Sequence, residues 1–113
     1  MKLEFPRGDS YEKGFIMKSR STREPVTEVF DEIYFTVKTF ASDEEFLFQK
    51  TLTGGGITSD GEGHYTLLIA PEDTDDLDFR EYDVDFEFVK GTFKRTFYGV
   101  LKLTKEVTHS NNE

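Results

Sequence analysis

The chain has 113 residues, a formal net charge of −9, no Cys and no Trp, yet 12 Phe and 5 Tyr. Without Cys there is no disulfide, thiol nucleophile or Cys-ligated metal. The acidic balance argues against nucleic acid and anionic membranes as partners, because both favour a basic surface. At this length we expect one domain, residues 1–108, followed by a polar tail, residues 109–113.

The first half of the chain predicts four strands. Residues 2–5 and 11–18 form the first two, and the polar segment 19–28, which contains Pro25, is expected to be a loop. Residues 33–39 alternate with period two, the pattern of a half-buried strand, and residues 46–52 form the next strand.

The second half begins with a glycine-rich connection over residues 53–63, followed by a strand over residues 64–69. Pro71 and the acids after it predict a single helical turn, packed down by Leu77 and Phe79. Residues 82–88 and 93–103 read as a β-hairpin closed by Gly91 and Thr92. Gly99 inside a strand indicates a bulge or a close backbone approach.

The elements together predict an all-β fold. About seven short strands without a long helix are typical of an antiparallel, immunoglobulin-like β-sandwich, with a small barrel as the alternative. A parallel α/β fold is excluded, because no stretch supplies crossover helices.

Two motifs invite a functional interpretation. Arg7-Gly8-Asp9-Ser10 matches the integrin-binding tripeptide, but a turn with Gly8 supplying backbone freedom and Asp9 capping it explains the same residues. Four acids after Pro71 are candidate Ca²⁺ ligands, although they lack the Gly and distal Glu of an EF-hand loop, so a solvated turn is favoured; they are Asp73, Asp75, Asp76 and Asp78.

No constellation predicts catalysis or a cofactor. His64 and His109 are the only histidines, and neither has a second His or a nucleophile motif nearby in the sequence. Lys94 and Arg95 lie between aromatic residues, a pattern that can stack single-stranded nucleic acid. We expect ion pairs with the outward acids of residues 82–88 instead, given the net charge.

The aromatic residues exceed what one small core needs. Some should be exposed and mark a protein–protein contact, and edge strands offer a second adhesive surface. The candidates for this interface are Phe30, Phe40, Phe79 and Tyr98, with Phe46 a further surplus residue.

Short stretches in order along the chain carry a resemblance to a known group. They are residues 6–10, 33–38, 48–51, 70–74, 82–84 and 103–108. The chain resembles small phage and prophage proteins with an immunoglobulin-like fold, similar to the N-terminal domain of phage baseplate upper proteins. One departure is that Phe79-Arg80-Glu81 precedes Tyr82, where the family often has Gly. Tyr82 is still placed to form a tyrosine corner.

The resemblance implies a non-enzymatic structural module of a virion, in the tail or baseplate. Its partners would be other phage structural proteins or further copies of itself, with no nucleic acid, membrane or small-molecule substrate. Without a signal peptide or membrane-spanning run, we expect the host cytoplasm during assembly and then the virion. The alternative is a Ca²⁺- or carbohydrate-binding β-sandwich adhesion module that uses the turn around Asp73–Asp78.

Overall fold

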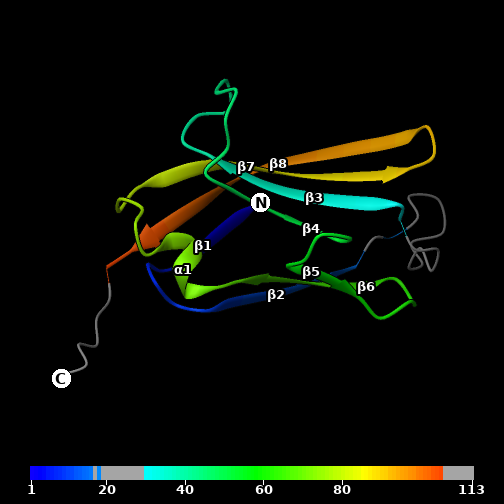
Figure 1. Ribbon diagram of the computed structural model, residues 1–113, viewed down its shortest axis with the longest axis horizontal. Helices are drawn as coiled ribbons and strands as arrows, with labels where there is room; N and C mark the ends of the chain where they lie inside the picture. The colour runs from blue at the N-terminus through cyan, green and yellow to red at the C-terminus, as the bar shows by residue number, and fades with distance from the viewer. Residues whose placement is uncertain (17, 19–29, 106–113) are drawn as a thin grey trace.

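The computed structural model describes residues 1–16, 18 and 30–105, which form a β-sandwich of two layers (Figure 1). One sheet has the order β1-β8-β7-β3-β4 and the other has the order β2-β6-β5. The elements are β1 (Lys2–Pro6), β2 (Tyr11–Ile16), β3 (Glu32–Lys38), β4 (Phe48–Thr51), β5 (Ile57–Ser59), β6 (His64–Ile69), α1 (Pro71–Thr74), β7 (Glu81–Lys90) and β8 (Phe93–Thr104).

The strand order is immunoglobulin-like. Strands β2 to β8 correspond to B, C, C′, D, E, F and G, which gives one sheet B-E-D and one sheet C′-C-F-G. The predicted all-β sandwich is therefore confirmed, with eight strands in the described residues where about seven were expected. The pairing is antiparallel except that β1 runs parallel to β8.

Alternation along the strands builds the core, as the sequence predicts. In β7 four side chains point inward and are at most 5% exposed, namely Tyr82, Val84, Phe86 and Phe88, while the acids between them lie on the outer face. Phe15 of the smaller sheet joins the layers, because its ring centroid lies 5.1 Å from that of Phe86 and 5.9 Å from that of Phe88. Burying one such side chain contributes about 1.5–3 kcal/mol.

Tyr82 forms the predicted tyrosine corner at the start of β7. Its hydroxyl donates a 2.9 Å hydrogen bond to the carbonyl oxygen of Asp78, and burial raises the pKa of the phenol. The bond ties the segment after α1 to the larger sheet, so the absence of Gly before Tyr82 does not prevent the corner.

The helical turn begins at Pro71, as predicted. Leu77 packs against the core, but the ring of Phe79 remains 43% exposed, so the expectation that it packs down is wrong. The Arg7 guanidinium covers that ring instead, at 4.0 Å from its centroid. A cation–π contact needs no burial of the ring, and Lys105 Nζ also lies 6.0 Å from its centroid.

Strand β5 lies inside the segment expected to be a loop. It has only three residues, pairs with β6, and buries Ile57 to 2% exposure. Three residues between glycines are too short for a period-two pattern to be recognised. The predicted strand over 46–52 is observed as β4, and the strand predicted over 11–18 ends at Ile16, before residue 17, which is not described.

The predicted loop over residues 19–28 and the predicted tail over residues 109–113 lie outside the described residues. In the part of the chain that the structure describes, no helix is long and apolar enough to cross a membrane.

Glu32 fixes the start of β3 against the turn after β4. Its carboxylate accepts hydrogen bonds from the backbone N–H groups of Ile33 (3.0 Å), Leu52 (2.9 Å) and Thr53 (3.1 Å), and from the Thr53 hydroxyl. Partial burial works to raise the pKa of Glu32, but the donated hydrogen bonds outweigh it and hold the pKa below its ordinary value.

Candidate interaction surfaces

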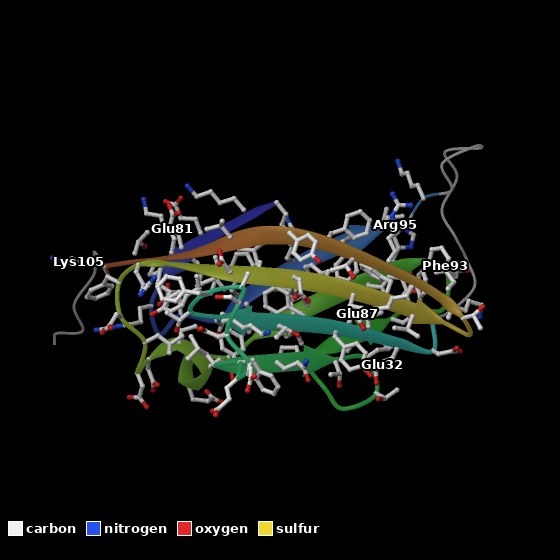
Figure 2. All side chains as sticks on the ribbon, turned by 90° about the horizontal axis from the view of Figure 1, so that it is seen from above. Glu32, Glu81, Glu87, Phe93, Arg95 and Lys105 are labelled. Carbon is white, nitrogen blue, oxygen red and sulfur yellow. The ribbon has the colours of Figure 1, made fainter. Side chains whose placement is uncertain are left out.

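Strand β8 has one half that is enclosed and one half that is open. Residues 100–102 lie between β7 and β1, and β1 also pairs with Leu103 and Thr104. The half that leads to the hairpin continues beyond β1 in Figure 2, towards the labelled Arg95 and Phe93. Among the described strands, none pairs with residues 94–98 on the side opposite β7. We call this stretch the open edge.

The backbone groups of the open edge follow from the register. Leu103 N–H donates to Arg80 O on the β7 side, whereas Val100 N–H donates to Met1 O on the β1 side. Alternate residues of an antiparallel strand direct their N–H and C=O groups to opposite sides. The even-numbered residues Lys94, Thr96 and Tyr98 therefore direct their backbone groups outward from the open edge.

Large aromatic side chains flank the open edge. Phe93 is 51% exposed, Phe97 is 38% exposed and Tyr98 is 73% exposed. The Arg95 guanidinium lies 5.1 Å from the Phe97 ring centroid. Sequence reasoning did not single out Phe93 or Phe97 as exposed. Alternation gives the direction of a side chain, whereas the neighbouring strands and the opposing sheet decide whether it is covered.

Gly99 marks the boundary between the two halves. A Cβ atom at this position would lie 2.5 Å from the carbonyl oxygen of Met1. The predicted close backbone approach is therefore confirmed, and it lets the start of β1 lie against β8.

A second surface lies on the outer face of the larger sheet. Register places four side chains in one row across four strands: Gln49 pairs with Thr36, Thr36 with Asp85, and Asp85 with Tyr98. We call these residues the polar row. Thr36 is only 8% exposed, and its hydroxyl accepts a 2.9 Å hydrogen bond from the Gln49 side chain.

The polar row is the floor of two adjoining hollows. The larger has a volume of about 340 Å³ and is walled by Tyr34 and Phe46. The smaller, of about 160 Å³, lies beside Tyr98 and Ala41, and both share Thr36 and Asp85. Burial is the main cause that raises the pKa of Asp85. Glu87 raises it further, while Lys38 and Lys94 oppose the shift.

The predicted interface residues do not form one patch. Phe30 is 6% exposed and packs against Phe88 and Tyr65 in the core, so its expected exposure is wrong. Phe40 is 54% exposed beside Arg80, whose guanidinium lies 5.0 Å from the ring centroid. Tyr98 lies in the polar row and is 73% exposed.

Phe79 belongs to the end of the molecule that carries α1, since its ring lies under the Arg7 guanidinium. Arg7 also donates to the carbonyl oxygen of Leu77 at 3.1 Å, and Gly8 N–H donates to the Thr74 hydroxyl at 2.9 Å. The expected turn is confirmed, and it is closed by the backbone N–H of Asp9. Arg7 is engaged within the fold, which argues against its use as an exposed recognition residue.

The acidic turn is used by the fold. The Asp73 carboxylate accepts from Ala70 N–H at 2.7 Å and lies 2.6 Å from Lys50 Nζ. In the described residues, no three His, Asp or Glu side chains converge to hold a metal ion. The four Ca²⁺ candidates therefore do not form a cluster of that kind; they are Asp73, Asp75, Asp76 and Asp78.

The basic residues of β8 behave in two ways. Lys94 Nζ lies 3.4 Å from the Glu87 carboxylate, so the predicted ion pair across the hairpin is confirmed. Arg95 faces the opposite side of the strand and lies over Phe97, where an ion pair was expected.

Comparison with known proteins supports the fold alone. No protein-family model matches the chain, and a search of curated proteins also finds no match. Among solved structures, the chain is similar to an endo-β-1,4-mannanase from Thermotoga petrophila, with a TM-score of 0.56 and 13% identity. The match covers 93% of this chain but only 18% of the mannanase chain.

Proposed function

We propose that the chain is a non-enzymatic assembly module that joins copies of itself through the open edge of β8. The observation that carries the proposal is a five-residue strand edge whose outward backbone groups pair with no other strand among the described residues, flanked by exposed aromatic rings. An unpaired edge is a template for another strand, and folded proteins pair, cover or charge such edges.

The open edge is self-complementary. Two copies related by a two-fold axis pair antiparallel with Thr96 opposite Thr96 of the second copy and Lys94 opposite Tyr98. All outward N–H and C=O groups of the even-numbered residues then find partners. The side-chain pairs also match, because Thr–Thr pairs across strands are favourable and Lys94 meets an aromatic ring.

The odd-numbered side chains support the same register. Arg95 comes to lie opposite Phe97 of the second copy, which extends the guanidinium–ring contact already present within one chain. Lys94 retains Glu87 as its partner on the same face. The net charge of −9 opposes association at long range, so moderate salt should strengthen the pairing by screening that repulsion.

We further propose that the assembly is a phage or prophage particle, in its tail or baseplate, built in the host cytoplasm. This step is supported by the stretches of sequence that resemble baseplate upper proteins. The genomic neighbourhood tests it: flanking tail or capsid genes support this placement, and metabolic neighbours contradict it. The self-pairing of the chain is tested separately and does not depend on the genomic neighbourhood.

Sedimentation velocity over a concentration series tests the pairing. The natural chain should shift from monomer to dimer as concentration rises, and Thr96→Pro should remain monomeric. Thr96 directs its N–H away from β7, so a proline there removes no hydrogen bond within the sheet. Lys13→Ala, on an unrelated strand, serves as the control and should associate like the natural chain. A natural chain that stays monomeric at every concentration and salt level contradicts the proposal.

A further inference from the structure

We propose that the polar row and its two hollows bind a neutral oligosaccharide. The site is formed by the outer face of the larger sheet and the segment between β3 and β4, and it is separate from the acidic turn after Pro71. The inference does not depend on the self-pairing of β8, because it rests on side chains of the sheet face, although Tyr98 belongs to both the polar row and the open edge.

The polar row and its two hollows together form a groove, and its shape suits an extended ligand. The polar row crosses four neighbouring strands, so it is roughly 14 Å long at about 4.8 Å between strands. Exposed rings stand at both ends, since Phe46 is 51% exposed and Tyr98 is 73% exposed. The electron-rich face of an aromatic ring attracts the weakly positive C–H groups of a sugar.

The segment between β3 and β4 forms the wall of the groove, and hydrogen bonds within the chain hold it in place without a ligand. Lys38 Nζ donates to Asp43 O at 2.8 Å, and the Asp43 carboxylate accepts from Phe40 N–H at 3.0 Å. Ala41 N–H donates to the Asp83 carboxylate on β7 at 2.8 Å. A preformed wall lowers the conformational cost of binding.

The floor of the groove offers hydrogen-bond acceptors. Gln49 lines the groove and donates a side-chain N–H to Thr36, so its side-chain carbonyl oxygen remains available as an acceptor, and Asp85 lines the same hollow with its carboxylate. Sugar hydroxyl groups supply the matching donors and also accept, so a single ring can bridge several of these groups.

The charges around Asp85 select a neutral ligand. The acids that face the groove are Asp83, Asp85 and Glu87 of β7 and Glu44 of the wall, and they repel an anion. Lys38 of β3 and Lys94 of β8 act electrostatically on Asp85 and weaken its attraction for an added cation. In the part of the chain that the structure describes, no metal-binding cluster is present.

A glycan array of neutral polysaccharides, followed by titration of the ¹⁵N-labelled chain with the hexasaccharide of the best-bound polymer, tests the proposal. Amide shifts should move at Thr36, Gln49, Asp85 and Tyr98. Phe46→Ala and Asp85→Asn should each weaken binding on the order of tenfold, which corresponds to about 1.4 kcal/mol.

Two matched variants serve as controls for the titration. Phe79→Ala removes an exposed ring that lines neither hollow, and Asp76→Asn removes an exposed carboxylate of the acidic turn. Both should bind like the natural chain. The proposal is overturned if no neutral polysaccharide on the array binds, or if only polygalacturonate or spermine binds. It is also overturned if the groove variants and the controls bind equally. Sedimentation of Phe46→Ala separates this result from the self-pairing, which should persist.

Discussion

The two halves of β8 have the same alternation of side chains and different surroundings. In the enclosed half, Leu101 and Leu103 are at most 2% exposed between β7 and β1. In the open half, Phe97 occupies the same face of the same strand and is 38% exposed. The pattern of a strand therefore fixes which way its side chains point, while the neighbouring strand decides whether the edge is structural or available to a partner.

The largest difference between the halves should come from truncating their side chains. Leu101→Ala should lower the free energy of unfolding by about 2–5 kcal/mol, because it opens a cavity in the core. Tyr98→Ala in the open half should change it by about 0.5 kcal/mol or less. Denaturant unfolding at a concentration that keeps the chain monomeric measures both. Equal losses would mean that the open half is packed as tightly as the enclosed half.

Gly99→Ala tests the boundary between the enclosed and open halves of β8. The new Cβ would lie 2.5 Å from Met1 O, a backbone atom, so β1 must shift away from β8. We expect a loss of about 1–3 kcal/mol in the free energy of unfolding, as for other overpacked sites. Gly14→Ala is the matched control, since its Cβ would meet nothing closer than 3.9 Å. If the two alanines behave alike, the contact at Gly99 has no energetic importance.

Tyr82→Phe tests how much the tyrosine corner at the start of β7 contributes to stability. It removes the hydrogen bond to Asp78 O and keeps the ring, so stability should fall by about 0.5–1.5 kcal/mol. Tyr98→Phe, which removes a hydroxyl from a side chain that is 73% exposed, should leave stability unchanged. Thermal unfolding of the pair distinguishes them, and an unchanged melting temperature for Tyr82→Phe would contradict the role of the corner.

Asp85→Asn should have a small effect on stability, and a stabilising one. Burial raises the pKa of Asp85 in the folded chain, so the folded state binds more protons than the unfolded state between the two pKa values. Stability contributed by Asp85 therefore falls as pH rises through this window. The variant should melt slightly above the natural chain at neutral pH, and the difference should shrink as pH falls below the ordinary pKa of Asp.

Charged and titratable groups from β3, β7, β8 and the segment after β3 surround Asp85. They are Tyr34, Lys38, Glu44, Asp83, Glu87, Lys94 and Tyr98. A pH profile of Asp85→Asn parallel to that of the natural chain would contradict the role given to Asp85.

Much of the fold was predictable because local patterns agreed with the final structure. The alternation of residues 82–88, the hairpin at Gly91, and the corner at Tyr82 are local or nearly local features. Strand β5 escaped prediction, because three residues carry no period and form a strand only through β6. The parallel pairing of β1 with β8 is likewise a long-range contact that no local pattern encodes.

The candidate surfaces were less predictable for a related reason. Phe30 and Phe97 look alike in the sequence, yet one is buried against Phe88 and Tyr65 and the other stands beside an unpaired edge. The polar row joins residues from four strands, and only the register brings Gln49 next to Thr36 and Asp85. Composition indicated a surplus of aromatic residues, but the position of each one in the fold depends on strand order.

Amide hydrogen exchange in β8 tests the self-pairing of the open edge most directly. Amides of odd-numbered residues such as Arg95 and Phe97 bond to β7 and should exchange slowly at every concentration. The amides of Lys94, Thr96 and Tyr98 should exchange rapidly in dilute solution and become protected as the chain associates. Association that leaves these three amides unprotected, or no change in their exchange at any concentration, would contradict the account.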